Sequence, residues 1–123
     1  MTNQKEYLTN LLSENQDAIV FGSLGTISYD LDTIEHPNKI CIRGAMGGVL
    51  GASLGYAMDS DKQVICLIGD GAYLMCMGTM ATIMTYNPKN LRVIIMNNKQ
   101  HKSTGGQKTN FTVVTPFEVV DVE

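Results

Sequence analysis

The sequence has few of the features that mark secreted, membrane or nucleic-acid-binding proteins. Among its 123 residues there is no tryptophan, and there are only three cysteines, an odd number. Cys41, Cys66 and Cys76 form no C-x-x-C pair and each lies in an apolar run, so we expect reduced thiols and a cytoplasmic protein. The net charge of −3 argues against a nucleic-acid or membrane-surface partner held by bulk electrostatics.

Other signals are missing as well. No apolar run reaches about 18 residues, so no membrane span is expected. The first residues, Thr2-Asn3-Gln4-Lys5-Glu6, contain no apolar signal region. There is no Walker A motif, and Leu74 stands where a dinucleotide-binding fingerprint starting at Gly69 would need glycine.

What is present is an alternation of short apolar runs with helical patterns. The patterns predict helices over 3–15, 44–58 and 72–86, and a short helix or turn ending at Leu31. Strands are predicted over 18–21, 40–42, 64–68 and 91–96. Residues 99–108 read as a polar loop, 111–114 as a short strand and 116–122 as one or two helical turns. The alternation predicts one α/β domain over residues 1–123, a three-layer parallel sheet with helices on both faces.

The most informative stretch is Val64-Ile65-Cys66-Leu67-Ile68-Gly69-Asp70-Gly71-Ala72. A buried strand here gives way to a helix, and a carboxylate stands at the junction. Removing the Asp70 carboxylate from water costs several kcal/mol, on the order of the desolvation penalty of a buried ion, unless a cation compensates. The flanking glycines let a ligand approach the backbone, and a helix N-terminus suits phosphate. A tight strand–helix turn with an N-capping aspartate is the alternative interpretation.

A second stretch, residues 44–58, carries glycine every four residues. Gly47, Gly51 and Gly55 would share one face of a helix, where each costs about 1 kcal/mol relative to alanine. This cost favours close approach of another backbone, either the protein's own sheet or a partner subunit. We favour a partner, because the next predicted helix is apolar nearly all round and rich in methionine.

Asp70 and Asn98 each follow a predicted buried strand. If those strands are neighbours, the two side-chain oxygens converge at one edge of the sheet. One carboxylate, one amide oxygen and a backbone carbonyl form a hard-oxygen site of the kind that holds Mg2+ beside a diphosphate.

Gly69-Asp70-Gly71 followed after 25 residues by Asn97-Asn98 resembles the signature of thiamine-diphosphate-dependent enzymes, in their pyrophosphate-binding module. The resemblance implies that Asp70, Asn98 and the Gln100 carbonyl hold Mg2+. It also implies that Met46 wedges the cofactor into its bent shape and that the Gly44 carbonyl accepts from its aminopyrimidine. The cofactor-binding set so implied comprises Gly44, Ala45, Met46, Gly69, Asp70, Gly71, Ala72, Asn98, Gln100 and His101.

A closer likeness lies in Gly69-Asp70-Gly71-Ala72-Tyr73-Leu74-Met75 and His101-Lys102-Ser103-Thr104-Gly105-Gly106-Gln107. These segments resemble phosphonopyruvate decarboxylases and sulfopyruvate decarboxylase β subunits, which convert an anionic 3-substituted pyruvate to an aldehyde and CO2. Positive charge near the expected crevice suits such ligands and comes from Arg43, Lys99, His101 and Lys102. His101 is the candidate catalytic residue, facing the substrate.

In this family a glutamate from a pyrimidine-binding module activates the cofactor, and no glutamate here lies at a motif. We therefore expect a separate pyrimidine-binding α subunit and no activity without it. The module also looks short at its C-terminus, which leaves its activity open. Two alternatives remain: the β subunit of a 2-oxoacid:ferredoxin oxidoreductase, disfavoured by unclustered cysteines, and a non-catalytic, truncated binding or assembly module.

Overall fold

Four apolar runs of the sequence form parallel strands at the centre of the computed structural model, which describes residues 1–123. They are β1 (Ile19–Gly22), β2 (Lys39–Cys41), β3 (Val64–Gly69) and β4 (Leu91–Asn97). A fifth strand, β7 (Glu118–Asp121), completes the order β2-β1-β3-β4-β7, and every neighbouring pair is parallel. The carboxyl ends of all five strands therefore lie at the same edge of the sheet.

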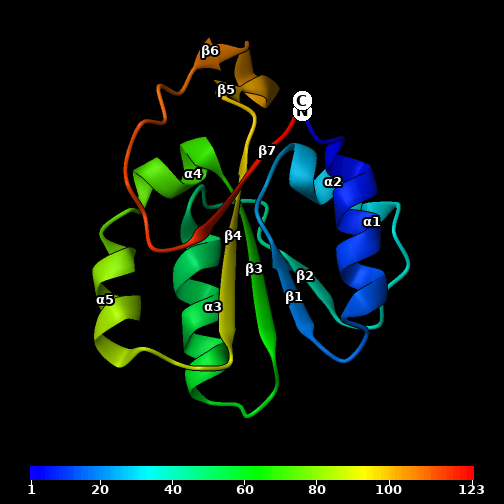
Figure 1. Cartoon of the computed structure of the whole chain (residues 1–123), viewed down its shortest axis with the longest axis vertical. Helices are drawn as coiled ribbons and strands as arrows, with labels where there is room; N and C mark the ends of the chain where they lie inside the picture. Colours follow the sequence, from blue (N-terminus) through cyan, green and yellow to red (C-terminus); the bar gives the residue numbers. More distant parts are fainter.

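Helices cover both faces of this sheet (Figure 1). α1 (Gln4–Glu14) and α2 (Thr26–Asp32) lie on one face, and α3 (Gly48–Met58), α4 (Asp70–Met75) and α5 (Thr79–Tyr86) lie on the other (Figure 1). Alternate residues of β3 point to opposite sides: Ile65 and Leu67 pack under α1 and α2, while Cys66 and Ile68 pack under α3. The predicted three-layer α/β fold is confirmed. No helix combines the length and the hydropathy needed to cross a bilayer.

The prediction of one continuous helix over 72–86 is wrong, because the structure has two helices there. The chain leaves α4 after Met75 and restarts as α5 at Thr79, with Gly78 at the junction. Glycine weakens a helix interior, and the break allows the Cys76 thiol to donate to the Met46 carbonyl (3.7 Å). The start of α3 and the end of α4 are thereby held together.

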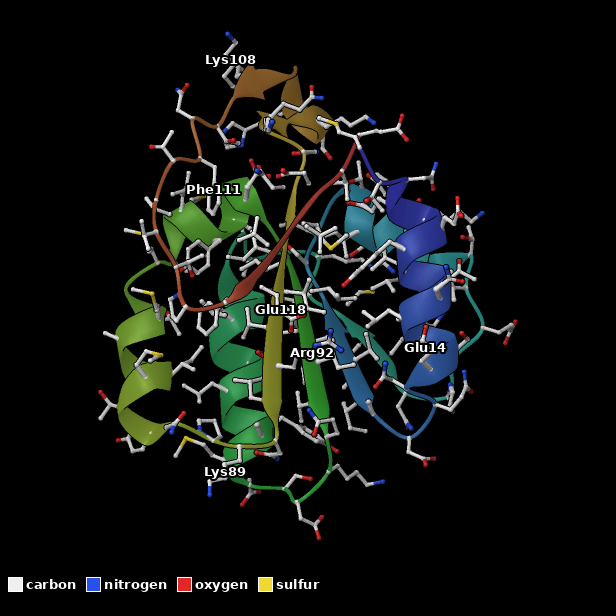
Figure 2. The ribbon with its side chains drawn as sticks, in the orientation of Figure 1. Glu14, Lys89, Arg92, Lys108, Phe111 and Glu118 are labelled. Carbon is white, nitrogen blue, oxygen red and sulfur yellow. The ribbon has the colours of Figure 1, made fainter.

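The prediction for the last residues was also wrong. Residues 116–122 contain no helical turn, because Val119 and Val120 extend as β7 along β4. β-Branched residues favour a strand, and this signal outweighs the helical spacing. Arg92 of β4 donates two hydrogen bonds to Glu118 (2.6 and 2.8 Å), an ion pair visible in Figure 2.

Residues 111–114 form no strand. This segment crosses α4 in irregular conformation, with the rings of Phe111 and Phe117 packed edge-on against the buried Tyr73. Figure 2 shows Phe111 beside α4. The polar loop over 99–108 contains a small antiparallel hairpin, β5 (Gln100–His101) and β6 (Gln107–Lys108), joined through a 3-10 turn at Lys102–Thr104.

The three regularly spaced glycines have different roles. Gly47 precedes α3 with a φ of 84°, and a Cβ there would lie 2.4 Å from Cys76 Sγ and 2.8 Å from the Ala72 carbonyl oxygen. Gly51 and Gly55 are exposed, and nothing lies within 4 Å of a Cβ at either position. The glycine face of α3 therefore does not pack on the protein's own sheet.

Candidate functional site

A pocket opens at the carboxyl ends of β1, β3 and β4. The β5–β6 hairpin lies at this edge of the sheet (Figure 1). Three chain segments form most of its walls: the loop from β1 into α2, the junction of β3 with α4, and the segment that follows β4, with Gln4 and Met46 added from elsewhere. Of the predicted cofactor-binding residues, those that line the pocket are Met46, Gly69, Asp70, Gly71, Ala72, Asn98, Gln100 and His101.

Asp70 is the first residue of α4 and is only 1% exposed. Its carboxylate accepts one hydrogen bond, from the Thr109 hydroxyl, and forms no ion pair. A carboxylate this far removed from water, with a single neutral donor and no ion pair, is costly in a protein interior. The position therefore fits a bound cation better than a simple helix cap, because Gly69 is the N-cap of α4 and the Asp70 carboxylate accepts from the Thr109 hydroxyl instead of a backbone N–H.

Asn98 follows β4, which is the neighbour of β3 in the sheet, with Gly69 paired to Met96. Asp70 and Asn98 thus lie just beyond adjacent strand ends and line the same pocket. Asn98 Oδ1 accepts from the Gln100 N–H (3.2 Å). The preceding residue, Asn97, donates to Asp121 of β7 (2.9 Å), and its Oδ1 is buried without a partner.

No three His, Cys, Asp or Glu side chains cluster as a metal site. The predicted cation ligands are of a different kind, one carboxylate, one amide oxygen and one backbone carbonyl. This set suits a hard cation that keeps positions for phosphate oxygens and water. The ligand roles of Asp70, Asn98 and Gln100 stay predictions.

His101 packs against the β3–α4 junction. A Cβ on Gly71 would lie 2.7 Å from His101 Cε1 and 2.9 Å from Nδ1, so only glycine allows the imidazole to lie this close. His101 is partly buried and lines the pocket. A titratable ring is therefore held beside the candidate cation site, where it can contact an anionic ligand.

Gly44 and Ala45, which follow β2, are exposed and do not line the pocket. Two of the basic residues expected near the crevice are also absent from the lining of the pocket. Arg43 pairs with Asp32 (2.6 Å), and Lys99 is exposed with a φ of 65°. His101 and Lys102 remain as the basic side chains of the pocket.

Sequence reasoning did not assign two parts of the site. The loop after β1 contributes Ser23, Leu24, Gly25 and Thr26 to the lining, and its glycines and position at a strand end were the available signal. Thr109, which binds Asp70, carried no signal, because a lone threonine beyond a hairpin has no motif.

The cysteines do not form a cluster. Cys66 is buried in β3 under α3, where burial raises the pKa of its thiol to about 12. Cys76 lies against Gly47, and Cys41 packs on the other face of the sheet. All three are free thiols.

Comparisons with known proteins place the chain in a family. Residues 22–122 match the family model of the thiamine pyrophosphate enzyme C-terminal TPP-binding domain. A phosphonopyruvate decarboxylase of Streptomyces viridochromogenes is 36% identical over 104 residues, covering 83% of this chain and 26% of that protein. The sulfopyruvate decarboxylase subunit beta of Methanothermobacter thermautotrophicus is 32% identical over 110 residues, covering 89% of this chain and 58% of that one.

Among solved structures, a 2-oxoglutarate:ferredoxin oxidoreductase from Magnetococcus marinus superposes with a TM-score of 0.63 at 16% identity. It covers 87% of this chain and 40% of that one, and it shows a shared fold. The chain spans between a quarter and about three fifths of the decarboxylases described above. The family match covers the ends of all three strands at the pocket, and the chain belongs to the thiamine pyrophosphate enzymes, as their C-terminal TPP-binding domain.

Proposed function

We propose that the chain binds thiamine diphosphate with Mg2+ and acts as the β-type subunit of a decarboxylase for pyruvates that carry a second anionic group at C3. Phosphonopyruvate and sulfopyruvate are the candidate substrates, and the products are an aldehyde and CO2. The buried, cation-free carboxylate of Asp70 beside Asn98 is the observation that carries this proposal. The names of the decarboxylase relatives support the substrate class.

Each residue of the pocket has a defined task in this proposal. Asp70, Asn98 and the Gln100 carbonyl hold the cation, and the N–H groups of Gly71 and Ala72 face the diphosphate. The bound cofactor supplies the ring that stabilises the carbanion left by decarboxylation. Lys102 holds positive charge for the anionic substrate, and the His101 ring lies at the pocket wall within the same segment.

The proposed partner is a separate subunit with the pyrimidine-binding module and its activating glutamate. Two observations support it: the relatives named as β subunits, and the apolar surface of α3, α4 and α5. That surface exposes Tyr56, Met58, Met75, Met77, Met84 and Tyr86 in addition to the glycine face of α3. Large exposed apolar side chains gathered on neighbouring helices are typical of a protein–protein interface. The free cysteines support a cytoplasmic location.

Calorimetry with Mg2+ and thiamine diphosphate tests cofactor binding, with and without a candidate pyrimidine-binding subunit. We expect binding heat from the pair and none from the pair that carries Asp70→Ala. Absence of heat in both wild-type mixtures would favour a non-catalytic assembly module.

Release of CO2 from phosphonopyruvate, sulfopyruvate and pyruvate then tests the reaction and its substrate class. We expect turnover of an anionic 3-substituted pyruvate only when both subunits are mixed. Robust decarboxylation by this chain alone would contradict the need for a partner.

Gly51→Ala and Gly55→Ala test the docking face. Both positions are exposed, so each alanine should stabilise α3 by about 0.5–1 kcal/mol in the chain without its partner. The same changes should weaken subunit association, because added methyl groups separate closely packed backbones. Unchanged association in analytical ultracentrifugation would place the partner elsewhere.

A further inference from the structure

Thr109 is a buried residue in a mostly exposed segment. It follows β6 directly and is 9% exposed, whereas residues 102–108 before it are all exposed. A polar side chain buried at such a place needs a hydrogen-bond partner. The partner is the carboxylate of Asp70, which is 39 residues away in sequence.

Three contacts connect Thr109 to both halves of the pocket. Its hydroxyl donates to Asp70 Oδ2, at the end of β3. Its backbone N–H donates to the Lys99 carbonyl (3.2 Å), between Asn98 and Gln100, after β4. Its methyl carbon Cγ2 lies 3.3 Å from the place of a Cβ on Gly71. One residue thus fixes the β3–α4 junction relative to the segment that follows β4.

The hydrogen bond suits a carboxylate that receives a cation. An uncharged hydroxyl fixes the orientation of the carboxylate without neutralising it, so the negative charge stays available. It occupies Oδ2 and leaves Oδ1 without a hydrogen bond at the pocket lining. In metal sites generally, ligating carboxylates are themselves hydrogen-bonded, and loss of such an outer contact costs about 10–100-fold in metal affinity.

We propose that Thr109 is a positioning residue for the cation: its hydroxyl orients Asp70, and its backbone fixes Asp70 against the Asn98–Gln100 segment. This inference rests on the proposed Mg2+ and thiamine diphosphate site. Thr109 itself contacts neither substrate nor cofactor in the proposal.

A purely structural anchor is the competing explanation, and the chain offers a matched control. Thr115 lies in the same irregular segment, and its hydroxyl shares a hydrogen bond with the buried Tyr73 (2.9 Å). Thr115→Val removes a comparable hydroxyl contact that does not involve Asp70. A structural role would make the Thr109 and Thr115 variants behave alike.

The experiment uses Mn2+ as the probe and measures its binding by electron paramagnetic resonance, with saturating thiamine diphosphate and the pyrimidine-binding subunit present. Four proteins are compared: wild type, Thr109→Val, Thr109→Ser and Thr115→Val. Valine keeps the shape and packing of threonine without the donor, and serine keeps the donor. If Thr109→Val fails to fold by circular dichroism, Thr109→Ala supplies the variant without a hydroxyl.

We expect Thr109→Val to weaken Mn2+ binding by about 10–100-fold. Thr109→Ser should stay within about threefold of wild type, and Thr115→Val should lower the Tm without changing Mn2+ affinity. Wild-type affinity in the hydroxyl-free variant, or equal weakening in the serine variant, would overturn the role of Thr109 while leaving the proposed function intact. Failure of the wild-type pair to bind Mn2+ would overturn both.

Discussion

At the scale of single residues, the account depends on one carboxylate in an unfavourable place. Asp70 is buried, has one neutral hydrogen-bond donor and forms no ion pair. Such a residue destabilises the cofactor-free fold, and its presence is explained if a ligand compensates for the cost when it binds.

Asp70→Asn tests this trade-off. The amide has nearly the same shape but no charge, so the cofactor-free chain should gain about 1–3 kcal/mol in its free energy of unfolding. Mg2+-dependent binding of thiamine diphosphate should be lost. Urea denaturation without Mg2+ and calorimetry with it measure the two effects. A variant that is less stable than wild type, or that binds equally well, contradicts the interpretation.

Gly71→Ala tests the packing of His101. The added methyl group would meet the imidazole at 2.7 Å, so the ring must move out of the pocket wall. We expect weaker cofactor binding and, in the His101→Ala/Gly71→Ala double variant, partial recovery because the clash is removed. Recovery is the informative result. If the double variant binds as poorly as Gly71→Ala alone, the imidazole is not what the methyl group displaces.

The sequence was sufficient to predict Asp70, Asn98 and His101 as candidates, since each lies in a motif at a predicted strand end. The structure places all three at one pocket. Thr109 could not be predicted in this way, because its position depends on how the chain folds back after the β5–β6 hairpin, a tertiary contact that leaves no local pattern. The loop after β1 carried a signal in its glycines and in its place at a strand end, but no motif assigned its residues a role.

At the scale of elements, the contact between the start of α3 and the end of α4 leaves no room for a side chain at Gly47. Gly47 combines a left-handed φ with contact to Cys76 and to the Ala72 carbonyl. A side chain here would face both backbone strain and a collision with main-chain atoms.

Gly47→Ala should therefore lower the free energy of unfolding by about 2–4 kcal/mol. The matched control is Gly51→Ala in the same helix, where the site is open and the sign of the effect is reversed. Chemical denaturation of both variants measures the contrast. Similar effects from the two substitutions would show that Gly47 is not a packing constraint.

Most helices and strands could be predicted from the spacing of apolar residues. One of them is α1 with its Asn3 cap, whose side chain accepts from the Glu6 N–H (2.9 Å). The errors lie where two signals compete. The apolar run over 72–86 hides a break at Gly78, and the C-terminal segment mixes a helical spacing with β-branched residues. In both cases contacts with distant segments decide the outcome: Cys76 with the start of α3, and β7 with β4.

At the scale of the whole molecule, the two faces of the sheet differ. α1 and α2 cover one face (Figure 1), whereas the helices on the opposite face expose several methionine and tyrosine side chains. The core under α3 is nevertheless fully buried at Cys66 and Ile68, and this burial raises the pKa of the Cys66 thiol to about 12. Burial is the main cause of this shift, and a hydrogen bond from Ser53 opposes it.

Because of this thiol, the free energy of unfolding should depend on pH in the alkaline range. The pKa of the thiol in the folded chain lies above the unfolded value of about 8.5. Its contribution to the free energy of unfolding is therefore complete below that value and decreases as the pH rises toward 12. Between pH 8 and pH 10, ionisation of this thiol in the unfolded chain should lower the free energy of unfolding by about 2 kcal/mol. Urea denaturation of wild type and Cys66→Ala measures this, and the variant should have a shallower alkaline slope. Identical slopes would mean that Cys66 is not shielded from solvent.

The most direct test of the central claim is the location of a bound cation. Crystals of the chain with its pyrimidine-binding partner, thiamine diphosphate and Mn2+ give an anomalous signal at the metal. We predict a peak between Asp70 and Asn98, at about 2.1 Å from an oxygen of each side chain. A crystal that contains the cofactor but shows the metal elsewhere, or ligated by neither residue, would contradict the account.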